Sequence, residues 1–218
     1  MVAATLQATG PAATVLALVA ADGTVAADHA RALLDPATPM RDLADAIHAV
    51  CVLHGALPGV VEHARTGCTD PEASQWLAVA ADAMAAERAL LARLTAAVGP
   101  LPSTPGQAAS ENAVMAQRHA LEMLAKSDRN GCAIGTAIAF VLDWQAVRSV
   151  LDAGALRIGQ PRGANFMPTV RLTRDLLDRL VPTFPTQRAM VFGAQQMLAQ
   201  HRGLWHLLEA RASARDRR

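Results

Sequence analysis

Residues 70–100, DPEASQWLAVAADAMAAERALLARLTAAVGP, decide the fold class of this chain. The opening Asp-Pro-Glu is a strong helix start, because it supplies a capping side chain, a proline suited to the first turn and an acid near the positive end of the helix dipole. The closing Gly-Pro ends the helix. Between them runs a stripe with alternating spacings of three and four: Leu77, Ala80, Met84, Glu87, Leu91, Leu94 and Val98. This spacing predicts one long helix over 71–98 that packs against other helices.

Composition supports a helical fold for the rest of the chain. Its 218 residues are 52% hydrophobic and 18% charged, which excludes a disordered protein. Alanine dominates and only 3% of residues are aromatic, so the core suits close-packed helices better than sheets. The 20 basic and 19 acidic residues leave a net charge of +1, which argues against a dedicated nucleic-acid binder. We therefore expect an all-α protein.

Proline and glycine mark the ends of the other helices. These are expected at 14–21, 25–34, 40–65, 105–127, 131–153, 169–181 and 186–211. Gly55 and Pro58 should interrupt the helix over 40–65. Short connections between the four long helices favour antiparallel neighbours. The sequence thus predicts a single all-helical domain over 1–218. Its core is an up-down helical bundle at about 40–158. Additional helices lie at the N- and C-terminal ends, and the C-terminal pair is expected at about 168–212.

Several ionisable residues fall where a packed helix would carry apolar ones. Glu87 lies in the middle of its apolar stripe, where a charge is costly unless it is paired or binds a metal. The helix over 105–127 is polar in its middle, and charged residues continue the otherwise apolar helix over 131–153. The candidates for a ligand-binding site or buried polar network are Glu87, Glu111, Arg118, His119, Asp143 and Arg148.

Three interpretations of these residues stay open. In the first, buried ion pairs join Glu87 or Asp143 to Arg118 or Arg148. In the second, the same groups line a pocket for a small ligand. In the third, iron or manganese is bound, as in ferritin-like di-metal proteins, by Glu87, Glu111, His119 and Asp143. That family carries Glu-x-x-His on two helices, and this sequence has no Glu-x-x-His.

Other polar residues have simpler explanations. His201 and His206 are five residues apart, so they do not share a helix face, and we expect them at the surface or along a groove. Thr104 and Gln107 have the spacing of a capping box. The polar tail at 212–218 should be frayed, and the arginine-rich end, with Arg211, Arg215, Arg217 and Arg218, is typical of a solvated tail.

Three cysteines lie far apart in the chain, without a CxxC pair, at Cys51, Cys68 and Cys132. This pattern fits neither a disulfide framework nor a zinc site. We expect each to be a small buried hydrophobic residue.

Four segments resemble a small all-helical bacterial family of unknown function. They are HGALPG (54–59), PSTPGQ (102–107), QRHALEMLAKSDRNGCA (117–133) and DWQAVR (143–148). The resemblance covers most of 40–158. It implies a helical fold and no particular activity, and it suggests that one site or core network contains Glu87, Glu111, His119, Asp143 and Arg148.

No GxSxG, Walker or HExxH motif occurs, so whether the protein is an enzyme stays open. The apolar run at 15–21 lacks the preceding basic residue of a secretory signal, and no run reaches the roughly 20 apolar residues of a membrane span. We expect a soluble, cytoplasmic protein that binds a partner or small ligand through a polar-lined groove, with neither nucleic acid nor membrane as a partner. The alternative is a ferritin-like, metal-dependent oxidoreductase. The small-residue stripe of Gly131, Gly135 and Ala139 also suits the close approach of a neighbouring helix, which is compatible with a homodimer.

Overall fold

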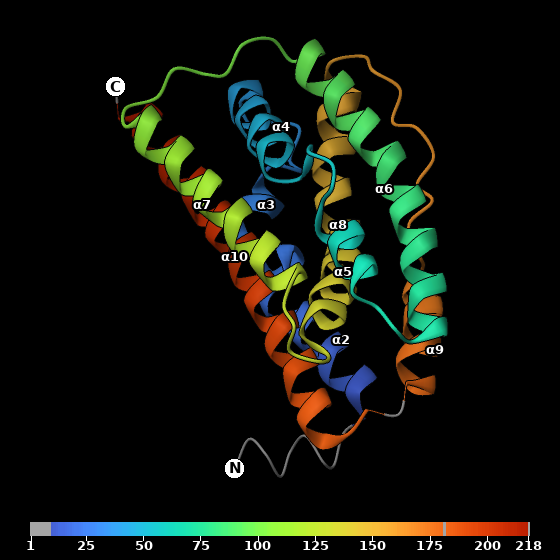
Figure 1. The fold of residues 1–218 in the computed structure, drawn as a ribbon. Coiled ribbons are helices and arrows are strands. Elements are labelled where there is room, and N and C mark those ends of the chain that lie inside the picture. Colours follow the sequence, from blue (N-terminus) through green and yellow to red (C-terminus); the bar gives the residue numbers. More distant parts are fainter. Residues whose placement is uncertain (1–9, 181, 218) are drawn as a thin grey trace.

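The computed structural model describes residues 10–180 and 182–217, and over these ranges the chain forms helices and no strand (Figure 1). The elements are α2 (Pro11–Asp22), the 3-10 turn η1 (Thr24–Ala26), α3 (Asp28–Ala32), α4 (Met40–His54), α5 (Val60–Thr66), α6 (Pro71–Ala97), α7 (Gln107–Ala125), α8 (Cys132–Arg157), α9 (Val170–Arg179) and α10 (Phe184–Asp216). This confirms the all-α fold class.

The helix ends largely follow the capping residues. Asp70 accepts a hydrogen bond from the Ala73 N–H (2.8 Å), and α6 starts at Pro71 as predicted. Gly55 and Pro58 separate α4 from α5. The C-terminal helix is longer than predicted, because α10 continues to Asp216, past the expected end at 211.

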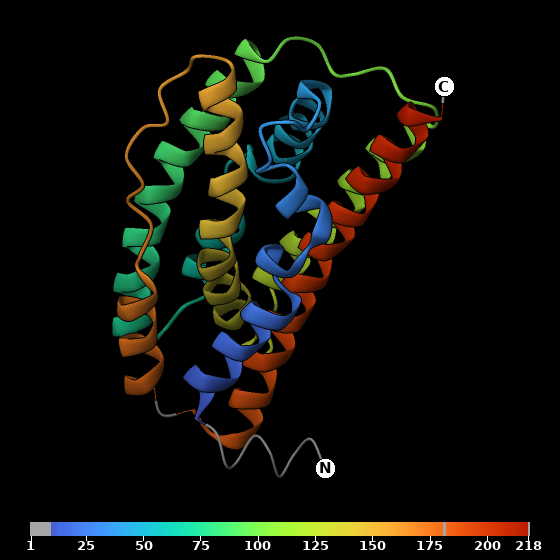
Figure 2. The same ribbon diagram turned by 180° about the vertical axis from the view of Figure 1, so that it is seen from behind.

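The core lies around α8 and α10, whose bulkiest side chains, Trp144, Trp205 and Phe140, are almost completely buried. The two helices cross closely near their N-terminal ends (Figure 2). A Cβ on Gly135 would collide with the Met190 carbonyl of α10. The small-residue stripe of α8 therefore receives a helix of the same chain, and the homodimer stays a prediction.

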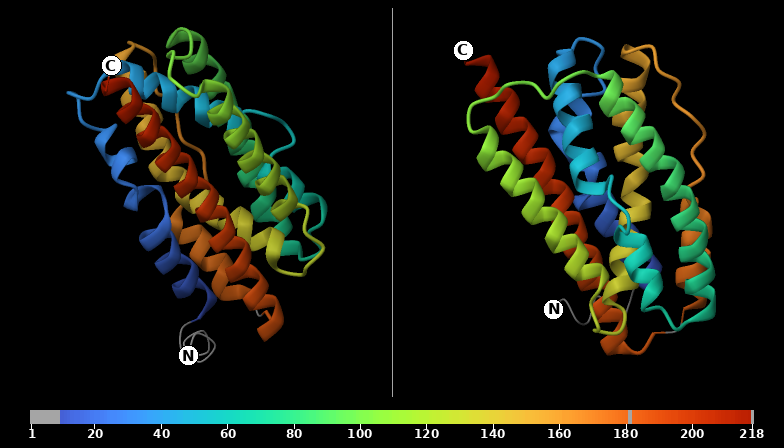
Figure 3. Two further views of the ribbon diagram at one scale, coloured as in Figure 1. Left: turned by 90° about the vertical axis from the view of Figure 1, so that its left-hand side faces the viewer. Right: turned by 45° about the horizontal axis from the view of Figure 1, so that its top comes forward.

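The order of the long helices in space is not their order in the chain. Residues 98–106, which include three prolines, form a long connection over the end of α4 and carry α7 to the side of α10 (Figures 1 and 3). Both α4 and α5 pack against α6 and also against α7. The predicted up-down bundle, in which helices that follow one another in the chain are neighbours in space, is therefore not confirmed. The proline-rich connection is long enough that α4 and α5 lie between α6 and α7.

Within the described ranges, α8 is the helix that is long and apolar enough to cross a membrane. No such stretch was expected from the sequence, because Asp143 interrupts the apolar run of this helix. Of the most apolar window of α8, 78% is buried inside the protein, as in the core helix of a globular fold.

Candidate functional site

Glu87 of α6 is buried and paired. One carboxylate oxygen accepts a hydrogen bond from Arg148 (2.5 Å), and the other accepts one from the Trp144 indole N–H (2.9 Å). Arg148 also donates to Asp152 and to two main-chain carbonyls of the loop before α9. Burial raises the pKa of the Glu87 carboxyl, against the opposing effects of the Trp144 hydrogen bond and the Arg148 charge. Glu87 and Arg148 thus form a buried ion pair that holds a loop.

Asp143 of α8 belongs to a second buried group. Its Oδ1 accepts a hydrogen bond from the Thr24 N–H (2.7 Å), and its Oδ2 accepts one from the Thr24 hydroxyl (2.6 Å). The Trp205 indole N–H donates to the same hydroxyl oxygen (2.9 Å). A Cβ on Gly23 would collide with the Asp143 carboxylate, so glycine is needed for this close approach.

Two histidines extend this group toward α4. Nδ1 of His201 lies 2.6 Å from Oδ2 of Asp143, and Nε2 of His201 lies 2.9 Å from Nε2 of His54. His54 is 6% exposed and packs against the rings of Phe140 and Trp144. Burial, and then the neighbouring His201, lower the pKa of His54 well below 6.5. We call Asp143, His201 and His54 the Asp-His-His chain.

The prediction for His201 was wrong, since it is 1% exposed, whereas His206 is exposed as expected. A spacing of five places the two histidines on different faces of α10, and it does not determine which of them is buried. His201 continues a core stripe of α10 formed by Ala194, Met197, Leu198, Leu204, Trp205 and Leu208. Like Glu87, His201 is a polar residue within an apolar stripe, and this pattern in the sequence indicates its burial.

The remaining predicted residues lie elsewhere on α7. Glu111 and His119 are exposed, and Glu111 accepts a hydrogen bond from Gln107. Arg118 is half-buried beside a pocket. The structure therefore does not bring the six predicted residues together. The Trp144 side chain lies between two separate groups, donating to Glu87 and packing edge-on against His54.

No group of three or more His, Cys, Asp or Glu side chains in the described ranges is arranged to hold a metal ion. In the Asp-His-His chain, both Nε2 atoms face each other and Nδ1 of His201 faces Asp143, so these three nitrogens are not directed at a common point. The iron or manganese hypothesis thus finds no supporting geometry at Glu87, Glu111, His119 or Asp143.

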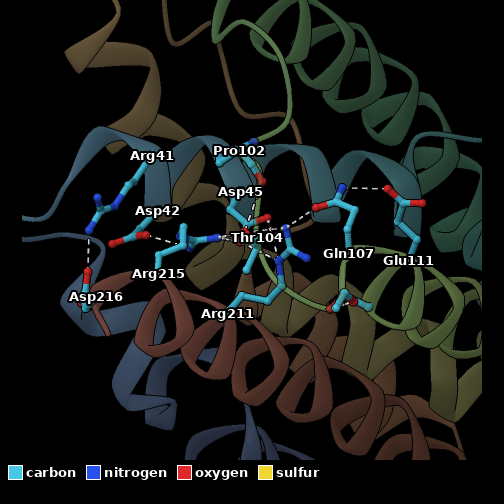
Figure 4. Close-up of polar contacts among 12 residues, drawn as sticks. Arg41, Asp42, Asp45, Pro102, Thr104, Gln107, Glu111, Arg211, Arg215 and Asp216 are labelled. Atoms are coloured by element: carbon cyan, nitrogen blue, oxygen red, sulfur yellow. Dashed lines mark hydrogen bonds and ion pairs between the residues drawn. The ribbon is translucent and has the colours of Figure 1, made fainter. Parts of the chain in front are cut away.

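A third buried network fastens the end of α10 to α4. Figure 4 shows Arg215 reaching toward Asp42 and Asp45, with Arg211 beside them. Arg211 donates to Asp45 (2.8 Å), and Arg215 donates to Asp45 and Asp42 (2.7 Å each). The expectation of a frayed tail was therefore wrong up to Asp216, where α10 ends, and the expectation of a solvated tail was wrong for Arg211 and Arg215, which pair with buried carboxylates.

The predicted capping box of Thr104 and Gln107 was wrong, because Thr104 belongs to this same network. The Thr104 hydroxyl accepts a hydrogen bond from Arg215 (2.8 Å) instead of capping α7 (Figure 4). The residue before α7 is Gly106, whose φ of 73° is in the left-handed region that favours glycine. The cysteines are free, with Cys132 buried as expected and Cys51 and Cys68 half-buried.

A pocket of about 300 Å³ lies beside the Asp-His-His chain. It is formed by the turn between α4 and α5 and by parts of α5, α6, α7 and α8. Its lining includes apolar side chains such as Met84, Leu121 and Phe140, together with His54. We call it the His54 pocket.

Charged side chains line the rest of the His54 pocket. Arg88 is paired with Glu62, and Lys126 is paired with Glu122. His63 also lines the pocket, and burial, followed by the charge of Lys126, lowers its pKa. Arg118 has neither a hydrogen bond nor an ion pair with the residues that the structure describes. Three basic side chains and two acidic ones thus leave a positive charge that the pocket itself does not balance.

The comparisons with known proteins identify the family. The model of a family of unknown function, DUF6975, matches residues 19–216. The chain belongs to this family. Comparison of this chain with the curated proteins and with the solved structures gives no match. The DUF6975 match spans both the His54 pocket and the Asp-His-His chain, and it agrees with the resemblance to an all-helical family of unknown function.

Proposed function

We propose that this protein binds a small anionic molecule in the His54 pocket. The proposal depends on Arg118, whose guanidinium lines the pocket and has no acidic partner among the described residues. The other two basic side chains of the pocket, Arg88 and Lys126, each have one. The guanidinium presents a planar set of donors that matches a carboxylate or phosphate group.

The pocket's form supports a small ligand rather than a protein partner. Its volume of about 300 Å³ is at the lower end for small-molecule sites, which combine apolar walls with a few convergent polar groups. A second, wider groove lies between the α5–α6 turn and the start of α10, and it shares His63 and Lys126 with the pocket. That groove is more open, and the buried His54 is not part of its lining. The His54 pocket therefore fits the expected polar-lined site better.

Binding of inorganic phosphate and of a small dicarboxylate, each followed by isothermal titration calorimetry, tests the proposal. We expect Arg118→Gln to weaken binding at least about tenfold, since a charge-assisted hydrogen bond contributes roughly 1.5–3 kcal/mol. Arg171→Gln is the matched control, because Arg171 is an 82% exposed arginine of α9 outside the pocket. Equal affinity of the Arg118 variant and the wild type, or no binding of either anion, would overturn the proposal.

A further inference from the structure

The hydrogen bonds around Asp143 fix the direction of the Asp-His-His chain. An indole N–H can only donate, so the Thr24 hydroxyl accepts from Trp205 and directs its own hydrogen to Asp143. An ionised carboxylate can only accept, so the short contact between Asp143 and His201 places a hydrogen on Nδ1 of His201. One side of the His201 ring is therefore a donor.

The contact between the two imidazoles then holds one proton. Nε2 of His201 and Nε2 of His54 are 2.9 Å apart, which requires a donor on one ring and a lone pair on the other. When both rings are neutral, His201 carries its hydrogen on Nδ1, so the shared proton belongs to Nε2 of His54. Nδ1 of His54 is then an unprotonated nitrogen, and it has no hydrogen-bond partner among the described residues.

We infer that Asp143, His201 and His54 form a proton relay, in which Nδ1 of His54 is a base for a ligand in the His54 pocket. This inference rests on the proposed function, because the ligand is the small anion held by Arg118, here with a hydroxyl as well. The hydroxyl O–H bond breaks and its oxygen keeps the electron pair, while an Nδ1–H bond forms on His54. The Nε2–H bond of His54 breaks, and an Nε2–H bond forms on His201.

The relay moves the positive charge to the place where it is best tolerated. On His54 the charge would sit between the rings of Phe140 and Trp144, without a carboxylate in contact. On His201 it lies 2.6 Å from the Asp143 carboxylate, as in other sites where an acid orients and stabilises an imidazolium. The lowered pKa of His54 agrees with this, since it reflects the cost of placing a charge on that ring.

The charged groups that face His54 come from five helices. They are Asp143 of α8, His201 of α10, Glu62 and His63 of α5, Arg88 of α6, and Arg118 and Glu122 of α7 with Lys126 directly after it. Asp143 is the acid in contact with the histidine pair, whereas the acids across the pocket are paired with basic side chains. Asp143 therefore sets the direction of proton movement.

A ¹⁵N NMR titration of histidine side chains in the full chain tests this relay without a ligand. At neutral pH we expect His54 to carry its hydrogen on Nε2 and His201 to carry its hydrogen on Nδ1. On acidification, His54 should change tautomer, from Nε2–H to Nδ1–H, while it stays neutral and His201 becomes the imidazolium. His54→Gln and His201→Gln assign the resonances, with His206→Gln as an exposed control.

A hydrogen on Nδ1 of His54 at neutral pH would overturn the inference, as would a positive charge that appears on His54 before His201. Asp143→Asn gives a second readout, since loss of the carboxylate should remove the switch of His54. If that variant does not fold, the wild-type titration still decides. Anion binding can fail while the tautomer switch is present, so the relay and the proposed function are tested separately.

Discussion

Burial acts differently on Glu87 and on His54. Glu87 keeps a partner on each carboxylate oxygen, and one of them, Arg148, carries the opposite charge. His54 has a neutral aromatic environment and one hydrogen-bonded neighbour, His201. Loss of the Glu87 carboxylate would therefore leave a buried, uncompensated positive charge on Arg148. For His54, burial instead disfavours the protonated, charged form of the ring.

Glu87→Gln should lower the free energy of unfolding by about 3 kcal/mol, because it leaves the buried Arg148 without its main partner. Urea unfolding followed by circular dichroism measures this. Glu72→Gln is the control, since Glu72 and Arg179 form a pair in which both side chains are more than half exposed, with an expected loss below about 1 kcal/mol. Equal losses for the two variants would contradict the assignment of Glu87 to a buried pair.

The stability of the protein should fall on acidification in part because of His54. The pKa of His54 is lowered on folding, so below a pH of about 6.5 the unfolded chain takes up a proton on His54 that this buried ring does not keep in the folded protein. The difference in unfolding free energy between the wild type and His54→Gln should therefore shrink between about pH 6.5 and pH 5, by at most about 1.4 kcal/mol per pH unit. His206→Gln should leave the pH dependence unchanged. Parallel curves for the wild type and His54→Gln would refute this explanation.

At the scale of elements, α10 has two different attachments. Near its N-terminal end it crosses α8 through glycines, and a Cβ on Gly193 would collide with the Cys132 carbonyl. At its C-terminal end, Arg211 and Arg215 hold it to acids of α4. Between these attachments lies His201, so the position of α10 determines whether His201 reaches His54 and Asp143.

Gly193→Ala should destabilise the fold by about 1–3 kcal/mol, because the added methyl group meets backbone that cannot move without separating α8 from α10. Gly203→Ala is the matched control in the same helix. There the Cβ meets Nε2 of Gln117 at 2.8 Å, the far end of a flexible side chain, and alanine favours the helix by up to about 1 kcal/mol. Thermal and urea unfolding of both variants give the comparison; a stable Gly193→Ala variant would show that the crossing is looser than described.

At the scale of the whole molecule, the three polar networks join segments that are far apart in the chain. Asp143 bonds to Thr24, 119 residues away, and Arg215 bonds to Asp42, 173 residues away. The apolar core includes residues from α2 through α10. These connections favour cooperative unfolding of the part of the chain that the structure describes, and the single domain over 1–218 stays a prediction.

Native-state hydrogen exchange should therefore give the same free energy of opening for the slowest amides of α6, α8 and α10. That value should equal the free energy of unfolding from urea denaturation. Markedly faster exchange throughout α10 would indicate that the C-terminal helices form a separate unit, and the single-domain prediction would then be wrong.

The sequence was sufficient for most of the fold. Helix starts and ends depend on capping residues, proline and glycine within a few positions, so α6 could be placed nearly to the residue. The cost of a buried charge is also readable locally, so Glu87 could be expected to have a partner. Arg148 was one of the partners considered, and the structure shows that contact.

Which polar groups meet was decided only by the tertiary structure. His201, Thr24 and Asp143 lie on α10, η1 and α8, and nothing within one helix specifies that these three come together. Likewise, Arg211 and Arg215 belong to a tail that would be solvated if α4 were elsewhere. Helix formation follows from neighbours along the chain, whereas side-chain pairing depends on how helices cross, and that is set by many contacts between distant residues acting together.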